Sequence, residues 1–394
     1  MDELMRETGS EAHSCKICDS GNMRVVEGFD SLPGVTSDCR PWPPGRVLLQ
    51  CPQCGTVQKR TDGAWSADVK TIYDTYEIYA QSGGQEQVVF DPVSGSASAR
   101  SAQLLDTLLS DVEMASGGRM MDVGCGNGSL LRQFHERYPD WDLFGTEYDP
   151  RHRDAVEAIP GVQALHCGEP WGVDGEFDVI TMVHVLEHFT DPSTTLRRLK
   201  EKLRDGGRLI IAVPNVLRNP FDVTIVDHAL HFSPGSLASL IASTGLATEH
   251  LSPQNVSKEI SVLATKGAGA PTQTAPSPDS SVPADQIVRW LANTISAARE
   301  AAGHRHFGLF GTSIAANWLY GSVEDAVEFF VDEDSDRIGR HNLDRPILHP
   351  DQVPPGAVVF VAQPPEIASR ISRRLARRDV EYVAPPPMPL SRRR

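Results

Sequence analysis

The sequence predicts an α/β protein with a larger and a smaller α/β unit behind a small cysteine-rich module. Strand-like and helix-like segments alternate between Ser101 and Lys266, which is typical of a mostly parallel sheet with helices on both faces. Residues 267–285 are rich in Gly, Ala, Pro, Ser and Thr, a composition that buries too little surface to fold and predicts a linker. Five of the seven cysteines precede residue 55, which favours a metal site in a reducing compartment over disulfides.

The composition limits the function. With 394 residues, 40% of them hydrophobic, the chain can form two or three domains, and a fibrous or wholly disordered protein is excluded. A formal net charge of −15 disfavours nucleic acid and anionic membranes as partners. No run approaches the roughly 18 to 20 apolar residues of a membrane span, and the start MDELMRETGSEAH lacks the features of a secretory signal. We therefore expect a cytoplasmic protein with no nucleic-acid or membrane partner.

The N-terminal module, residues 1–70, contains two CxxC motifs. Each motif can place two thiolates on one tetrahedral ion, and four thiolates close a structural zinc site. The module has too few apolar residues for a large core, so we expect the zinc to support folding and not catalysis. Cys39 is a competing fifth thiol. The predicted ligands are Cys15, Cys18, Cys51 and Cys54.

The central unit, residues 71–266, carries the larger α/β pattern. Its predicted strands are RMMDV, DLFGTEY, VQALHC, FDVITMV, GRLIIAV and ISVLATK. Residues 71–100 precede this pattern and include a tyrosine-rich stretch.

The C-terminal unit, residues 286–394, follows the linker. A helical run, QIVRWLANTISAAREAAG, precedes the strands HFGLFG, VEFFVDE and AVVFVA and a helix around SIAANWLYG. This is a second, smaller βαβ pattern. The closing ARRDVEYVAPPPMPLSRRR is basic and proline-rich, and we expect it to be a solvated tail.

A glycine-rich turn, MDVGCGNGS, joins the first strand of the central unit to the amphipathic helix LLRQFHERY. Glycines let the backbone approach a ligand, and the helix start offers unpaired N–H groups. Glu147 ends the second strand, where a doubly wound sheet has its ribose-binding acid. This predicts a nucleotide-type cofactor. NAD fits poorly, because Ser129 stands where the dinucleotide fingerprint requires glycine or alanine.

DVGCGNG, followed by an acid-ended second strand, resembles the motif of class I S-adenosylmethionine-dependent methyltransferases. The stretches FDVITMVHVLEHFTDP and GGRLIIAVPN are similar to the fourth and fifth strands of that superfamily. The resemblance implies a Rossmann-like core that binds S-adenosylmethionine, with Asp122 and the glycines at the methionine end and Glu147 at the ribose. The implied cofactor-binding residues are Asp122, Gly124, Gly126, Gly128, Glu147 and Tyr148.

The order of the parts resembles the sugar C-methyltransferase family, whose members methylate the carbon next to a ketone in nucleotide-activated deoxysugars. FGLFGTSIAANWL and VEFFVDEDSDRIGRHNLDRPILHP are similar to the C-terminal domain of that family. The resemblance implies that a turn of this domain faces the nucleotide sugar. It also implies that the tyrosine-rich stretch within residues 71–100 closes over the site; packing between domains is the alternative role of its tyrosines. The implied substrate-binding residues are Tyr76, Tyr79, His231, Gly311, Thr312 and Ser313.

The segment IVDHALHFS is similar to a YDEHVFYFS-like segment of that family, in which a tyrosine, an acid and a histidine serve the substrate. Asp227 and His228 match the acid and the histidine, whereas Ile225 replaces the tyrosine and His231 a later aromatic residue. A histidine has the intrinsic pKa of a base near neutral pH, so we predict that His228 is the base and Asp227 its orienting acid. His188, in VLEHFTDP, is a second catalytic candidate. Histidines that cap or fill a helix start are the alternative.

These observations predict a methyltransferase that acts on a small molecule, namely a nucleotide-linked sugar or a related glycoside, with carbon methylation beside a ketone. Two alternatives stay open: O-methylation of a sugar or natural-product hydroxyl, and a zinc-bearing scaffold that binds the cofactor without turnover. The acceptor, the methylated atom and the oligomeric state are not specified by the sequence.

Overall fold

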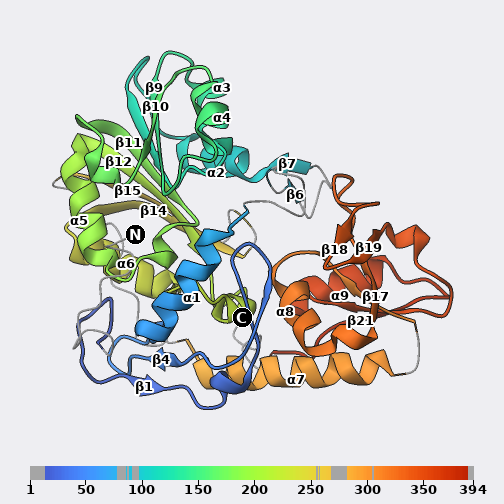
Figure 1. Ribbon diagram of the computed structural model, residues 1–394. Coiled ribbons are helices and arrows are strands. Elements are labelled where there is room, and N and C mark those ends of the chain that lie inside the picture. Colours follow the sequence, from blue (N-terminus) through green and yellow to red (C-terminus); the bar gives the residue numbers. More distant parts are fainter. Residues whose placement is uncertain are drawn as a thin grey trace.

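The computed structural model describes residues 14–77, 86, 88–90, 97–253, 256, 258–267, 282–303 and 306–388. The central unit, coloured cyan to yellow in Figure 1, lies beside the C-terminal unit in orange and red, and the blue N-terminal segments run along both. Tyr79, most of the predicted linker and the last six residues lie outside the described residues.

The central unit is a seven-stranded sheet in the order β10-β9-β8-β11-β12-β15-β14. Strands β8 to β12 pair in parallel, whereas β15 is antiparallel to both of its neighbours. Every strand predicted in this unit forms, and β14 is additional. The strands are β8 (Arg119–Val123), β9 (Asp142–Glu147), β10 (Val162–Cys167), β11 (Phe177–Val183), β12 (Leu203–Pro214), β14 (Ala247–Ser252) and β15 (Glu259–Thr265).

Helices cover both faces of this sheet, because the side chains of its inner strands alternate between two cores. Val179 and Ile210 enter the core around Phe134, and their sequence neighbours Ile180 and Leu209 enter the opposite core. A run of apolar residues is therefore buried on both sides. The helices are α2 (Arg100–Leu109), α3 (Ser129–Arg137), α4 (Arg153–Glu157), α5 (Pro192–Lys202) and α6 (Pro234–Ser243).

The N-terminal module does not form its sheet alone. Its antiparallel order is β1-β4-β5-β13, and β13 (Leu230–His231) comes from the central unit. The other elements of the module are β1 (Arg24–Val25), the hairpin β2 (Gly34–Val35) and β3 (Pro41–Trp42), β4 (Leu48–Gln50), β5 (Val57–Lys59) and α1 (Gly63–Asp74). The Asp62 side chain caps α1 by accepting a hydrogen bond from the backbone N–H of Trp65.

The C-terminal unit is a six-stranded sheet in the order β18-β19-β17-β16-β20-β21. Its elements are α7 (Ala284–Ala302), β16 (Phe307–Phe310), α8 (Ile314–Val323), β17 (Val327–Val331), β18 (His341–Asn342), β19 (Arg345–Leu348), β20 (Val358–Val361), α9 (Pro365–Arg374) and β21 (Glu381–Val383). The expectation of a solvated tail is wrong as far as Met388. β21 pairs with β20, Met388 is buried, and the Trp290 indole N–H donates to the carbonyl of Pro386 at 2.8 Å.

The three parts share one hydrophobic core. It contains Val26 and Val57 of the N-terminal module, Phe221 of the central unit and Trp318 of α8. The Trp318 indole N–H also donates to the carbonyl of Pro33 at 2.8 Å. The two α/β units are therefore held together by the N-terminal segments as well as by their connection along the chain.

Short elements complete the fold. β6 (Val88–Phe90) and β7 (Ala97–Ala99) form an antiparallel pair before α2. The 3₁₀ turns η5 (Leu186–His188) and η6 (Pro220–Thr224) carry residues discussed below. Within the described part of the chain, no helix has both the length and the apolar character needed to cross a membrane.

Candidate active site

A cleft of about 1150 Å³ lies between the central and C-terminal units. Its walls include the carboxyl ends of β8, β9 and β11, which is where open α/β sheets bind ligands. The opposite wall comes from the start of α8, from the end of β17 and from α9, and residues 37–39 and α1 of the N-terminal module also line it. All three parts of the chain therefore meet at one cavity.

The glycine-rich loop lies at the end of β8. Gly124, Gly126 and Gly128 have φ angles of 67°, 54° and 79°, in the left-handed region that favours glycine. A Cβ atom on Gly124 would lie 2.5 Å from Val185, because the loop passes close to the end of β11. Gly124 and Gly126 line the cleft; Gly128 is the N-cap residue of α3 and is not among the described lining residues.

Two carboxyl groups, of the buried Asp122 and the half-buried Glu147, lie beside this loop and line the cleft. Glu147 accepts hydrogen bonds from the backbone N–H groups of Gly126 at 2.8 Å and Tyr148 at 2.7 Å. Asp122 accepts one from the hydroxyl of Thr181, its partner across β8 and β11, at 2.6 Å. Burial raises the pKa of Asp122 to about 7 and also raises that of Glu147. Each carboxyl group can therefore gain from a polar ligand that replaces lost water.

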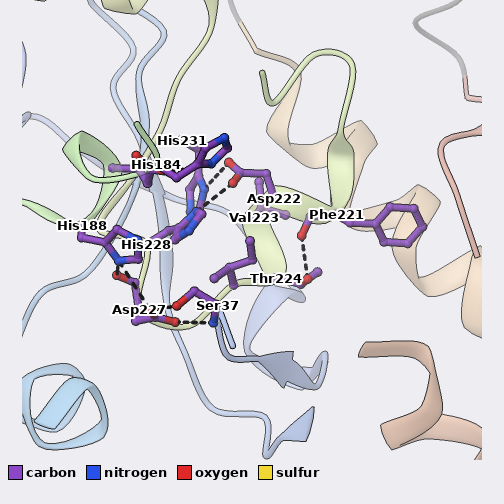
Figure 2. A network of polar contacts seen from close by, with 12 residues as sticks. Ser37, His184, His188, Phe221, Asp222, Val223, Thr224, Asp227, His228 and His231 are labelled. Atoms are coloured by element: carbon purple, nitrogen blue, oxygen red, sulfur yellow. Dashed lines mark hydrogen bonds and ion pairs between the residues drawn. The ribbon is translucent and has the colours of Figure 1, made fainter. Parts of the chain in front are cut away.

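The histidine-rich segment forms a buried network around Asp222 (Figure 2). One Asp222 oxygen lies 2.8 Å from Nδ1 of His228, and the other lies 2.7 Å from Nδ1 of His231. His228 lines the cleft, whereas His231 is buried behind it. Asp222, His228 and His231 are also close enough to hold a metal ion, but a proton on each Nδ1 explains both contacts, so we treat them as a hydrogen-bond network.

The structure gives His228 a different acid from the one that we predicted. The Asp227 carboxylate accepts hydrogen bonds from the backbone N–H and hydroxyl of Ser37 at 2.9 and 2.5 Å, and it lies 3.5 Å from Nδ1 of His188. Asp227 lies in a turn before β13, and its carboxylate contacts Ser37 of the N-terminal module and not the neighbouring His228, so sequence adjacency is a poor guide to contact. The turn η6 instead folds Asp222 back against His228.

The environments of the three histidines differ. Burial lowers the pKa of His188 to about 4, and burial together with the charge of Lys59 lowers that of His231 to about 4. Burial also acts to lower the pKa of His228, but the hydrogen bond and charge of Asp222 outweigh it, so the pKa is raised. His228 is the one of the three that holds a proton most readily.

The predicted substrate residues are only partly at the cleft. Tyr76 lines it and stacks on Tyr73 with ring centroids 5.4 Å apart, and Ser313 lines it at the start of α8. Gly311, Thr312, His231 and Asp227 are not among the described lining residues. The Thr312 hydroxyl donates to Asp332 at 2.9 Å, so it supports the wall from behind.

Sequence reasoning missed several residues of the site. Ser37 and Lys59 contact the histidine network from the N-terminal module, and no local motif marks them. Tyr73, which belongs to the tyrosine-rich stretch of the sequence, contacts His188. Asp222 had a signal, because it is an acid in the same short segment as the two histidines. The arginines Arg337, Arg370 and Arg374 line the C-terminal wall.

The four predicted zinc ligands come together in the N-terminal module. The Sγ atoms of Cys15 and Cys54 are 3.5 Å apart, those of Cys18 and Cys51 are 3.6 Å apart, and all four lie within 4.8 Å of one another. Cys39 is not in this group and lines the cleft instead. The Sγ–Sγ distances are close to the roughly 3.8 Å of a tetrahedral Zn–thiolate site.

The two CxxC turns have the same backbone geometry. The carbonyl of Cys15 accepts from the N–H of Asp19, and the carbonyl of Cys51 accepts from that of Gly55, both at 2.9 Å. Asp19 and Gly55 both have left-handed φ angles, of 56° and 75°. Paired turns of this kind present both thiols of each motif to one point, so the residues fit a tetrahedral metal ion.

Comparison with known proteins supports the central unit. Residues 97–251 match the family described as methyltransferase domain. Methyltransferase str3 of Strobilurus tenacellus is 27% identical over 111 residues, which are 28% of this chain and 40% of that protein. A ubiquinone biosynthesis O-methyltransferase of Xanthomonas euvesicatoria is 26% identical over 172 residues, which are 38% of this chain and 70% of that protein.

Other methyltransferase relatives are also matched over only part of their length, such as a ubiquinone biosynthesis O-methyltransferase of Schizosaccharomyces pombe, of which 47% is covered. Among solved structures, human N-acetylserotonin methyltransferase in complex with S-adenosylmethionine is similar, with a TM-score of 0.36 and 17% identity over 43% of this chain and 52% of that chain. The family match shows that residues 97–251 form a methyltransferase domain.

Proposed function

We propose that this protein transfers the methyl group of S-adenosylmethionine to a nucleotide-linked sugar or a related small glycoside, at the carbon beside a ketone. The observation that carries the proposal is the single cleft. It joins the glycine-rich loop and Glu147 to His228 and to the C-terminal unit. A cofactor site, a base and a second binding wall in one cavity suit a two-substrate transfer.

His228 is the proposed base. S-adenosylmethionine supplies an activated sulfonium methyl group, so the protein has to align the acceptor and remove a proton. The hydrogen bond from Nδ1 to Asp222 leaves Nε2 as the nitrogen that can accept a proton. In carbon methylation His228 would take the proton from the carbon beside the carbonyl. The electron pair left on that carbon would form the new bond to the methyl carbon, while the methyl–sulfur bond breaks with its electron pair on sulfur and S-adenosylhomocysteine leaves.

The charged C-terminal wall supports a phosphate-bearing acceptor. Arg337 and Arg374 line the cleft and are held in place by Asp332 and Glu333. Arg370 is exposed at the same wall. Guanidinium groups recognise phosphate through paired hydrogen bonds, and a methyltransferase for a small uncharged acceptor has no need of such a wall.

O-methylation is the second candidate. Ile225 lines the cleft at the position where the sugar C-methyltransferase family, which this segment resembles, has a tyrosine. One substrate-facing hydroxyl group is therefore missing. With a hydroxyl acceptor, His228 takes the hydroxyl proton instead.

The product decides between the two. We would incubate the protein with S-adenosylmethionine and a panel of nucleotide-linked keto- and hydroxysugars in deuterated water and analyse the products by mass spectrometry. We expect a methylated ketosugar with solvent deuterium at the carbon beside the ketone. A methyl ether without exchange supports O-methylation, and no product from a protein that binds the cofactor overturns the nucleotide-sugar proposal.

His228→Gln tests the base. We expect a loss of about 10²-fold or more in rate, because general-base catalysis contributes 10²- to 10⁴-fold, with S-adenosylhomocysteine affinity unchanged. His306→Gln is the control, because His306 has a 63% exposed side chain outside the cleft. Equal methyl-transfer rates for the two variants would show that His228 is not the base.

We also propose that Cys15, Cys18, Cys51 and Cys54 hold a structural zinc ion. Four thiolates fill a tetrahedral coordination sphere, so the ion would contribute to folding and would leave no position for substrate.

A further inference from the structure

We propose that Lys59 of the N-terminal module is a positioning residue for the base, acting through His231 and Asp222 to fix the tautomer and orientation of His228. This inference rests on the proposed function in one respect only, the role of His228 as the base. The hydrogen-bonded chain from Lys59 through His231 and Asp222 to His228, called the relay below, fixes histidine tautomers. These tautomers can be measured without a methyl acceptor.

Lys59 is a buried cation with a complete set of acceptors. Its side chain is 1% exposed. Its Nζ atom lies 2.6 Å from the carbonyl oxygen of Val223, 3.0 Å from that of Ile225 and 3.0 Å from Nε2 of His231. An ammonium group has three N–H donors, whereas a neutral amine has two. The three contacts therefore match the charged form. Burial lowers the pKa of Lys59 to about 7, although Asp222 and Asp227 act to raise it, so the charged form predominates at pH 6.

This arrangement sets the tautomer of His231. Because the ammonium group is only a donor, Nε2 of His231 must be the acceptor, and its proton must then be on Nδ1. That proton faces the Asp222 oxygen 2.7 Å away. His231 is thus a neutral donor to Asp222.

Asp222 links the tautomer of His231 to that of His228. With one oxygen occupied by His231, its other oxygen accepts from Nδ1 of His228 at 2.8 Å (Figure 2). The free lone pair of His228 is then on Nε2. When His228 takes a proton, the Asp222 carboxylate next to it stabilises the imidazolium.

The N-terminal module also holds the backbone of this segment. β5 pairs with β13, so His231 lies opposite Val57. The backbone N–H of Lys59 donates to the carbonyl of Ala229 at 2.9 Å, and the indole N–H of Trp65 donates to that of Val226 at 2.8 Å. Residues 57–65, which lie outside the methyltransferase domain, therefore hold the backbone around His228 and His231 in place.

Removing the Lys59 ammonium group should free His231 to change its tautomer. In Lys59→Met, Nε2 of His231 loses its donor, and the cation that disfavours a proton on this ring is gone. His231 should then populate its other tautomer or its cation at pH 6, and the tautomer of His228 should become mixed. The charged or titratable groups facing His228 are Asp222, Asp227, Glu187, His231, His188 and His184.

The test is ¹⁵N NMR of histidine-labelled full-length protein at pH 6, using long-range ring correlations that report which nitrogen carries the proton. We expect wild-type His231 and His228 to be protonated on Nδ1, and Lys59→Met to change both patterns. Lys200→Met is the matched control, because its Nζ donates to the carbonyls of Thr244 and Gly245 and to no histidine; its spectrum should equal the wild-type one.

Two outcomes overturn the proposal: an Nε2–H tautomer of His231 in the wild-type protein, or unchanged His231 and His228 signals in Lys59→Met. The first needs no variant, so it decides the matter even if Lys59→Met does not fold. With an acceptor in hand, Lys59→Met should lower kcat tenfold or more while the KM for S-adenosylmethionine stays within twofold. Altered tautomers together with a fully active His228→Gln would mean that the relay exists and the proposed base is wrong.

Discussion

At the scale of single residues, Glu147 is the sharpest probe of the cofactor site. It accepts two backbone N–H hydrogen bonds from the loop and its own strand end. In Glu147→Gln an amide NH₂ faces one of these donors, and a carboxylate that would bind ribose hydroxyls is lost. We expect the Kd of S-adenosylhomocysteine, measured by calorimetry, to rise about tenfold or more, by about 1.4 kcal/mol. Glu157→Gln is the control, an acid of α4 paired with Arg153; an equal loss there would argue against a specific role.

The pH dependence of methyl transfer separates Asp222 from Asp227. The raised pKa of His228 places the acid limb of the rate profile above pH 6.5, because the base works only after losing its proton. Asp222→Asn removes the main raising contact, so the acid limb should move to lower pH and the maximal rate should fall by about 10²-fold or more. Asp227→Asn should shift the limb less, since Asp227 is bound by Ser37. A larger shift for Asp227→Asn would restore the partner expected from sequence.

At the scale of elements, the loop after β8 depends on a close approach. Gly124 and Gly206 both have left-handed φ angles, of 67° and 78°. A Cβ atom meets Val185 at 2.5 Å in the first case and nothing within 4 Å in the second. Both alanine substitutions introduce a backbone strain of about 1 to 2 kcal/mol. Only Gly124→Ala also creates a steric clash, with Val185 beside the cofactor loop. We expect a larger drop in thermal unfolding midpoint and weaker S-adenosylhomocysteine binding for Gly124→Ala; equal midpoints and affinities would contradict this.

The same scale shows where sequence patterns were sufficient. The inner strands of the central unit, such as β11 and β12, were predictable because each contains an apolar run between turns and is buried on both faces. β21 was missed because it is an edge strand with exposed and half-buried residues, in a segment whose prolines and arginines suggest solvent. Its pairing with β20 depends on a neighbour that the local sequence does not reveal.

At the scale of the molecule, the N-terminal module connects the proposed zinc site to the cleft. Its CxxC motif at Cys51 leads directly into β5, which pairs with β13. We expect about one zinc per chain by atomic emission. Cys51→Ser should lower both the zinc content and the thermal midpoint, and a chelator should do the same to the wild-type protein. Cys39→Ser should keep its zinc, because Cys39 is outside the cluster. Full occupancy in Cys51→Ser would refute the ligand assignment.

The amino-acid sequence by itself determined the α/β class, the glycine-rich turn with Glu147 at the next strand end, and the two CxxC pairs. These features arise from short-range periodicity, from the backbone freedom of glycine and from ligand spacing within a turn, so they act over a few residues. The choice of Asp222 over Asp227, the insertion of Lys59 behind His231 and the core shared by all three parts were decided only by the tertiary structure. Lys59 and His231 are 172 positions apart, and what brings them together is the pairing of β5 with β13 and the burial of apolar surface from every part of the chain.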